Sequence, residues 1–452
     1  MLGASLSRWT MSYFAAALVC LIGAEALMAA GFGYPTVALA APETLLLVHL
    51  TTIGWLSLLM TGALLQFVPV LVARPLQWPD LSAPALLLIL AGLAALLSGF
   101  ASMAGIISAP LEVLPVGGLL LMLGFGAVIA TLGRTMWQAR PLTLPTKFVV
   151  AGLAALTGTV ALGETFALTI SGLAGGEEVL SLWTHGVPLH ALLGLGGWMT
   201  LSAMGVSYRL FAMFMLAPDA EGFSTRLVLY AGIAALLVVA AATPFAMVAT
   251  AGLPAMLLVA GVSGLVALAL YGRDIVALYR QRKRRVIELN AQAAIGGFAA
   301  LGATVLLLVG LLVAGQLSSH IGALTYLFVF GWLTGLGLSK LYKIIAFMTW
   351  LECFAPVMGK RQTPRVQDLV DEPHAAPWFG AYYAAVGFGT LTLLVDLPIA
   401  FQLFVGVQLF ATLAIVRHFY RTRGLLNVPL KLRGSTALPH LFRPKSIIRS
   451  PS

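Results

Sequence analysis

Long apolar segments follow one another along this chain with only short connections between them. A helix that crosses a bilayer needs about 20 mostly apolar residues. Only 9% of the 452 residues are charged, whereas a soluble domain carries about 25%. The sequence therefore predicts an all-α membrane protein with about twelve transmembrane helices. The expected spans are 11–31, 43–73, 82–107, 113–137, 147–173, 185–216, 225–249, 252–275, 292–315, 320–350, 378–398 and 400–420.

The positive residues gather on one side of these predicted spans. The opposite connections carry acids instead, namely Glu43, Glu112, Glu177 and Glu178. Cytoplasmic loops are enriched in Lys and Arg, so we expect both termini in the cytoplasm. The basic residues of that side are Arg8, Arg74, Arg134, Arg140, Lys147, Arg226, Arg273, Arg280, Arg282, Lys283, Arg284, Arg285, Lys360, Arg361, Arg365, Lys431, Arg433, Arg443, Lys445 and Arg449.

The same charge bias accounts for the formal net charge of +10. We interpret it as topology, and the lipid bilayer, not nucleic acid, is the expected partner. The basic tail is expected to lie on the anionic cytoplasmic leaflet. The first apolar stretch is too long for a signal peptide and is predicted to be the first span. The predicted location is the inner (plasma) membrane of a prokaryote.

Soluble-enzyme signatures are missing from the sequence. The two cysteines, Cys20 and Cys353, lie far apart and form no CxxC or CxxCH motif, so we expect inert thiols. There is no GxxxxGK[ST] phosphate loop, no GxSxG elbow and no HExxH zinc helix.

An internal repeat is centred on a Gly-Trp pair in the second, sixth and tenth spans. In each of these spans the residue eleven positions after the tryptophan is long and polar. The repeat predicts three units of four helices, at 1–141, 142–286 and 287–423, followed by a basic cytoplasmic tail at 424–452. We expect Arg209 and Lys343 to extend toward the cytoplasmic headgroups. The repeated residues are Gly54, Trp55 and Gln66; Gly197, Trp198 and Arg209; and Gly331, Trp332 and Lys343.

The histidines divide between the two sides. His374, His418 and His440 fall on the predicted cytoplasmic side, whereas the other four lie at the outer ends of the three repeated spans. Imidazole ligates haem iron, copper or zinc, although a single interfacial histidine is also ordinary. His185 and His190 are candidate metal ligands, but they are five residues apart and share no helix face; His185 is expected in the preceding loop. The four outer histidines are His49, His185, His190 and His320.

Two carboxyl groups, Glu25 and Glu164, lie inside predicted spans. Ionisable groups are costly in lipid and usually face a cavity or a partner. Two interpretations stay open: the carboxyls carry protons, or they hydrogen-bond one helix to another.

With these features together, the chain resembles subunit I of the haem–copper oxidases. The matching stretches are GALLQFVP, GVSYRLFA and SKLYKIIA, which are similar to the Tyr-(Gln/Arg/Lys)-x-x-Pro repeats of oxidase-subunit-I-like membrane proteins. A looser similarity links it to haem- and copper-containing membrane proteins of the nitric-oxide stress response. The resemblance implies a b-type haem near the outer face, held by the second and tenth helices. His49 and His320 would be its ligands, with His190 as the substitute; Tyr326 aligns with His49 on the tenth helix.

The sequence also departs from the oxidase pattern. The seventh span has no histidine for a copper site, and Ala212 and Ala346 replace the family proline that Pro69 keeps. We therefore expect no oxygen or nitric-oxide reduction by the oxidase mechanism.

Three functions follow from the sequence. The first is a haem protein for electron transfer or diatomic-gas handling, a haem-dependent oxidoreductase if it is an enzyme, working with a cytochrome or other membrane subunit. The second is a copper- or metal-handling transporter that uses the outer histidines, Met199, Met204 and the acids Glu177 and Glu178. The third is a cofactor-free scaffold or assembly protein.

Overall fold

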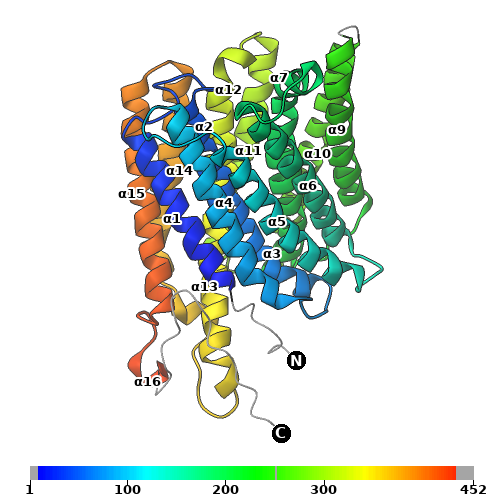
Figure 1. Ribbon diagram of the computed structural model, residues 1–452. Helices are drawn as coiled ribbons and strands as arrows, with labels where there is room; N and C mark the ends of the chain where they lie inside the picture. The colour runs from blue at the N-terminus through cyan, green and yellow to red at the C-terminus, as the bar shows by residue number, and fades with distance from the viewer. Residues whose placement is uncertain (1–8, 250–251, 434–452) are drawn as a thin grey trace. The chain divides into compact units, whose positions relative to one another are not determined.

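The computed structural model describes residues 9–249 and 252–433 (Figure 1). Arg8, His440 and the basic tail residues Arg443, Lys445 and Arg449 lie outside this part. Within the described residues the chain forms helices and turns and no β-strand, as predicted. The long helices are α1 (Thr10–Ala29), α2 (Pro42–His49), α3 (Leu58–Leu71), α4 (Ser82–Met103), α5 (Val113–Trp137), α6 (Leu144–Ile170), α7 (Glu177–Ala191), α8 (Ser202–Met215), α9 (Phe223–Val248), α10 (Leu253–Arg280), α11 (Leu289–Val313), α12 (Leu317–Tyr326), α13 (Gly335–Cys353), α14 (Glu372–Leu394) and α15 (Pro398–Arg423).

Each of the twelve predicted spans coincides with helix. Three of them are made of two α-helical parts joined by a wider segment: α2 and α3, α7 and α8, and α12 and α13. Eleven of the helices in the described residues are long and apolar enough to cross a membrane. The remaining predicted span is α14, whose tyrosines, glycines and threonines lower its mean hydropathy. The fold is therefore that of a multi-pass α-helical membrane protein.

The wider segments fall at the Gly-Trp repeat. Each is π-helical: η1 (Leu50–Ser57), η3 (Leu192–Leu201) and η4 (Leu327–Thr334). Such turns are rare and occur frequently at functional sites. The hydroxyls of Ser57 and Thr200 donate to the carbonyls five residues earlier, at 2.8 and 2.6 Å. The tryptophans Trp55, Trp198 and Trp332 are all buried.

The chain divides into two compact units. Unit 1 comprises Met1–Leu39, Thr61–Gln66 and Ile287–Ser452, and unit 2 comprises Ala40–Met60 and Phe67–Val286.

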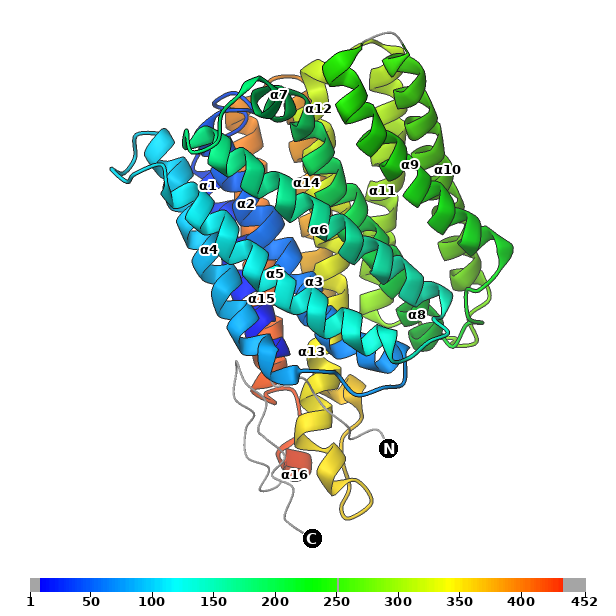
Figure 2. The same ribbon diagram turned by 45° about the vertical axis from the view of Figure 1, so that its right-hand side comes forward.

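In unit 2, α4, α5 and α6 follow one another side by side, as both views show (Figures 1 and 2). Gly92 and Gly117 let α4 and α5 approach closely, because a Cβ on Gly92 would lie 2.8 Å from the Gly117 carbonyl oxygen. Glycine at helix contacts is typical of membrane proteins. The helices α8, α9 and α10 meet at Asp274, whose carboxylate accepts hydrogen bonds from Tyr208 at 3.1 Å and Ser224 at 2.7 Å.

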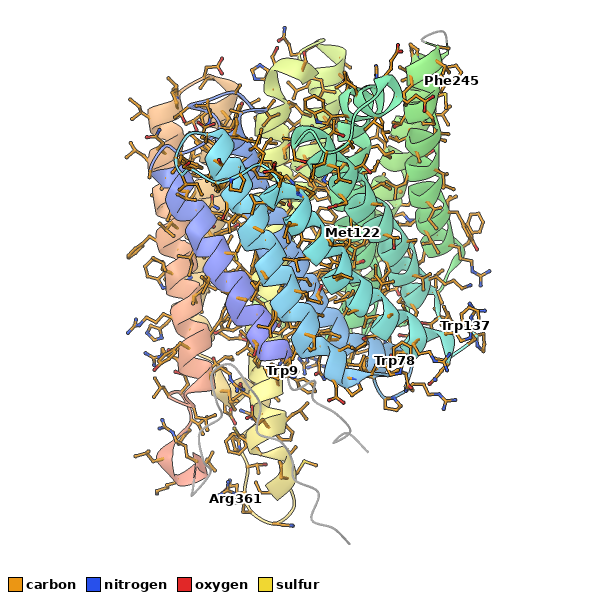
Figure 3. The ribbon with its side chains drawn as sticks, viewed as in Figure 1. Trp9, Trp78, Met122, Trp137, Phe245 and Arg361 are labelled. Carbon is orange, nitrogen blue, oxygen red and sulfur yellow. The ribbon has the colours of Figure 1, made fainter. Side chains whose placement is uncertain are left out.

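One end of unit 2 carries exposed tryptophans. Trp78 and Trp137 are 53% and 60% exposed, and Figure 3 shows both at the end opposite Phe245. The Arg140 guanidinium lies 3.7 Å from the centre of the Trp137 ring. Tryptophan and basic residues are enriched at membrane–water interfaces, so this end marks a bilayer boundary.

In unit 1, α1 packs against α15, and α14 and α15 form an antiparallel pair. The end of α13 continues into a small apolar cluster with the loop after it and with α16 (Leu430–Arg433); its core residues are Ala346, Cys353, Phe354, Leu369, Leu425 and Val428. The buried Arg423 guanidinium lies 3.0 Å from the Glu352 carboxylate and ties α15 to α13. This cluster was not predicted from the sequence.

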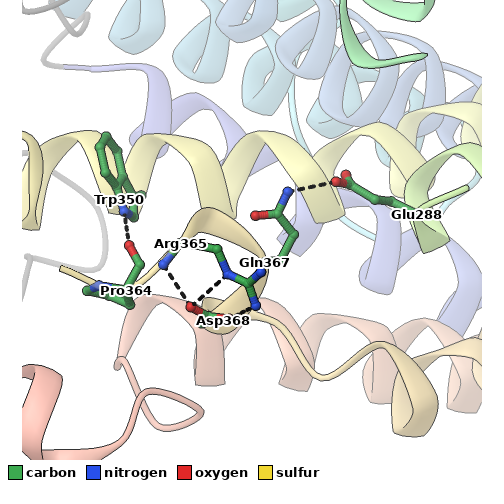
Figure 4. Close-up of polar contacts among 6 residues, drawn as sticks. All are labelled: Glu288, Trp350, Pro364, Arg365, Gln367 and Asp368. Atoms are coloured by element: carbon green, nitrogen blue, oxygen red, sulfur yellow. Dashed lines mark hydrogen bonds and ion pairs between the residues drawn. The ribbon is translucent and has the colours of Figure 1, made fainter. Parts of the chain in front are cut away.

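The connection between α13 and α14 is held by polar contacts (Figure 4). The Trp350 indole donates to the Pro364 carbonyl at 2.6 Å. Arg365 pairs with Asp368 at 3.1 Å, and the Gln367 amide donates to Glu288 at 2.9 Å. These contacts fold residues 364–368 against α13 and the start of α11.

A candidate paired-histidine site

Two of the sequence-predicted histidines meet in unit 2. His49 is the last residue of α2, directly before η1, and His190 is the last but one of α7, one residue before the end of α7 at η3. Their ring centres are 6.4 Å apart and their planes are inclined by 34°. Sequence spacing alone did not indicate that these two, of the four outer histidines, form a pair.

Both imidazoles are oriented by backbone carbonyls. The Nδ1 atom of His49 lies 2.8 Å from the Leu45 carbonyl oxygen, and that of His190 lies 3.0 Å from the Thr159 carbonyl oxygen. Because a carbonyl only accepts, Nδ1 carries the proton in each ring and Nε2 keeps its lone pair. A histidine that ligates a metal almost always donates its other ring N–H in this way.

The ring separation can be compared with that of two histidines whose Nε2 atoms lie in line on opposite sides of one metal atom. If each Nε2 lies about 2.0 Å from the metal and each ring centre about 1.1 Å behind its nitrogen, the ring centres are roughly 6 Å apart. The observed 6.4 Å agrees with this value.

Aromatic and small residues surround the pair. Phe100 of α4 lies 5.0 Å from the His49 ring and Phe166 of α6 lies 5.7 Å from the His190 ring, centre to centre. Gly163 leaves room for the His190 ring, because a Cβ there would lie 3.1 Å from Cε1. In the described part of the chain, no group of three or more His, Cys, Asp or Glu side chains forms a metal site.

The other outer histidines lie elsewhere. His185 is exposed and its Nδ1 lies 2.9 Å from the Ser181 carbonyl oxygen, in the same helix. Its expected position in a loop is wrong: Gly176 and the acidic first turn of Glu177 and Glu178 start α7 eight residues earlier, where acids favour a helix N-terminus. His320 belongs to unit 1 and stands half-buried at a kink in the first turn of α12.

Tyr326 is held by a hydrogen bond in unit 1. Its hydroxyl donates to Gln408 of α15 at 2.5 Å, and the Gln408 amide donates to Glu25 of α1 at 2.7 Å. The structure thus joins Glu25 and Tyr326, which the sequence analysis singled out separately. Glu164 belongs to unit 2, where its carboxyl occupies the space that a side chain at Gly118 of α5 would fill.

The polar residues after the repeat have different surroundings. Arg209 is 41% exposed and pairs with Asp219 at 2.7 Å. Lys343 is only 12% exposed and pairs with Glu288 at 2.6 Å, so its ammonium is held by a carboxylate of the same unit; its extension toward the headgroups stays a prediction. A nearby carboxylate neutralises the ammonium at less cost than leaving it unpaired in apolar surroundings. Gln66 is half-buried in α3.

Some residues at the site were not predicted from the sequence. Thr159 and Gly163 sit four residues apart on one face of α6, facing His190, but a threonine and a glycine in an apolar span carry no signal of their own. The hydroxyl two residues after each tryptophan, in Ser57, Thr200 and Thr334, was visible in the sequence. In Ser57 it accepts a hydrogen bond from the Trp198 indole at 3.1 Å.

Fold and site together define a multi-pass α-helical membrane protein with a paired-histidine site in one of its units. Protein-family models give no match to this chain, and a search of curated proteins finds none either.

Proposed function

We propose that this protein is an integral membrane haem protein that binds one b-type haem through His49 and His190. The observation that carries the proposal is the pair itself: two imidazoles oriented by backbone carbonyls, with ring centres 6.4 Å apart. Haem would bring four nitrogen ligands of its own, so His49 and His190 would be the residues that hold it. His190 replaces His320 as the second ligand.

The residues around the two histidines set the orientation of the rings, the basicity of the ligand nitrogens and the access of water. The Leu45 and Thr159 carbonyls fix both rings and raise the basicity of the ligand nitrogens. Phe100 and Phe166 provide an apolar wall that limits water. A haem with two histidine ligands has no open coordination position, and it supplies one-electron transfer when bound. Electron transfer is therefore the role we propose, ahead of gas binding.

The oxidase-like architecture belongs to this proposal. Three π-helical segments at equivalent places in α2–α3, α7–α8 and α12–α13 support three repeated units of four helices. The basic residues on one side support cytoplasmic termini in a prokaryotic inner membrane. A separate cytochrome or membrane subunit would exchange electrons with the haem.

The test is haem and metal analysis of detergent-purified protein. We expect about one b-type haem per chain, retained in His320→Ala and lost or strongly reduced in His49→Ala and His190→Ala. Copper without haem, lost in the same two variants, would contradict the haem proposal and favour the metal-handling function. Neither haem nor metal in protein from haem-replete cells would favour the cofactor-free scaffold.

A further inference from the structure

A second polar site lies inside unit 1. The Glu25 carboxyl of α1 is buried, and its Oε1 accepts hydrogen bonds from Gln408 at 2.7 Å and Thr412 at 3.1 Å, both on α15. Its Oε2 is buried without a hydrogen-bond partner. No lysine, arginine or histidine in the described part of the chain pairs with it. A buried carboxyl held only by neutral donors needs an explanation, because such groups in spans usually have a function.

The hydrogen bonds run in one direction along Tyr326, Gln408 and Glu25. The Tyr326 hydroxyl donates to the Gln408 Oε1, and the Gln408 Nε2 donates to the Glu25 Oε1. Glu25 Oε1 therefore acts only as an acceptor, from Gln408 and Thr412. The remaining oxygen, Oε2, is the one free to carry a proton.

We propose that Glu25 is a reversible proton-binding site inside the membrane, with the proton on Oε2 at neutral pH. Without its proton the carboxylate keeps the Gln408 and Thr412 donors on Oε1, so the same contacts hold both states. With the proton the group is neutral, which avoids an unpaired charge in a dry interior. The proton comes from and returns to water, and no bond other than Oε2–H forms or breaks.

The neighbouring titratable groups do not compete for this role. The tyrosines that face Glu25 are Tyr326 of α12 and Tyr382 of α14. Tyr326 already donates to Gln408, and Tyr382 donates to the Phe330 carbonyl at 2.8 Å. The facing groups on α15, Gln408 and Thr412, are neutral at every physiological pH. Glu25 is therefore the group that titrates.

Infrared difference spectroscopy of the purified full chain tests this inference. A protonated carboxyl gives a C=O stretching band well separated from carboxylate and amide bands. At neutral pH we expect Glu25→Gln to lose one such band, which in wild-type protein is replaced by carboxylate bands on raising the pH and returns on lowering it. The exposed Glu112 is the matched control: Glu112→Gln is expected to lose carboxylate bands only. Loss of carboxylate bands in Glu25→Gln at neutral pH would overturn the proposal, as would a C=O band that no pH change alters.

A second variant keeps the test decisive if Glu25→Gln does not fold. Tyr326→Phe leaves the carboxyl in place but frees Gln408, so the hydrogen bond to Glu25 Oε1 is no longer held in one direction. We expect the C=O band to shift in frequency and its pH midpoint to move. An unchanged band and midpoint in this variant would contradict the proposed site. The readout does not depend on haem, so its outcome is separate from that of the haem proposal.

Discussion

His49 and His190, more than a hundred residues apart in the sequence, bring their ring centres to 6.4 Å in unit 2, and each donates its Nδ1 proton to a backbone carbonyl. The two histidines lie at the ends of α2 and α7, next to the π-helical segments η1 and η3. The hydrogen bonds to the Leu45 and Thr159 carbonyls place the proton of each ring on Nδ1. The Nε2 lone pair of each ring then remains available for a ligand.

Gly163 is predicted to control the second histidine without being a ligand. A Cβ at this position would lie 3.1 Å from His190 Cε1, so a branched side chain must displace the ring. We expect Gly163→Val to lose at least half of the bound haem at an unchanged level of folded protein. Gly133→Ala, where a Cβ meets nothing within 4 Å, is the control and keeps the wild-type haem content. Full haem occupancy in Gly163→Val would contradict the assigned position of His190.

The Trp198–Ser57 hydrogen bond is predicted to stabilise the repeated helices of unit 2. Ser57→Ala leaves the buried Trp198 indole N–H without its acceptor, which costs about 1–3 kcal/mol. We expect a lower thermal midpoint in detergent, followed by tryptophan fluorescence. In the control, Ser98→Ala, the lost hydroxyl is solvent- or lipid-exposed and bonds only to the Ala94 carbonyl; its midpoint stays close to wild type. Equal midpoints for Ser57→Ala and Ser98→Ala would refute this role.

The buried Arg423–Glu352 pair is predicted to hold the end of α15 to α13. Both side chains are about 5% exposed or less, so Glu352→Gln leaves a buried guanidinium without its counter-ion, which costs about 3–5 kcal/mol. The exposed Arg209–Asp219 pair gives the comparison, because surface pairs contribute only about 0–1 kcal/mol. Unfolding in detergent should therefore be much easier for Glu352→Gln than for Asp219→Asn, and similar stabilities would contradict the prediction.

Acid pH is predicted to weaken the start of α14. The hydrogen bond from His374 at 2.8 Å lowers the pKa of the Asp371 carboxyl, just before that helix. A group whose pKa is lower in the folded state stabilises the fold above its unfolded pKa, about 3.9, and loses that contribution as the pH falls through the folded value. The thermal midpoint of Asp371→Asn should thus lie slightly below wild type from pH 6 down to about pH 4 and converge with it as the pH falls further, toward about pH 2. A constant difference over this range would argue against the assignment.

The sequence was sufficient to predict the helices because each span is encoded locally. Twenty or more apolar residues in a row specify a spanning helix whatever surrounds them, and all twelve expected segments are helical. The histidines and glutamates could likewise be recognised from the sequence, because both residue types are rare in apolar spans. Both intramembrane glutamates lie within helices, as expected.

Partnerships between helices could not be predicted in the same way. The pairing of His49 with His190 depends on the place of α6, whose Thr159 carbonyl orients one ring and whose Gly163 makes space for it. The burial of Lys343 depends on Glu288, which begins α11 and is distant in the sequence. The π-helical segments were not predicted either, because the Gly-Trp repeat marks their places in the sequence but does not specify the wider turn.

The central claim, that His49 and His190 ligate the same haem, is tested most directly by low-temperature electron paramagnetic resonance of the oxidised, detergent-purified protein. Two imidazole ligands give a low-spin ferric signal, and removal of either gives a high-spin signal. The proposal predicts a low-spin signal in wild type and His320→Ala, and a high-spin signal or no haem in both His49→Ala and His190→Ala. A low-spin signal that persists in His190→Ala and disappears in His320→Ala would contradict it.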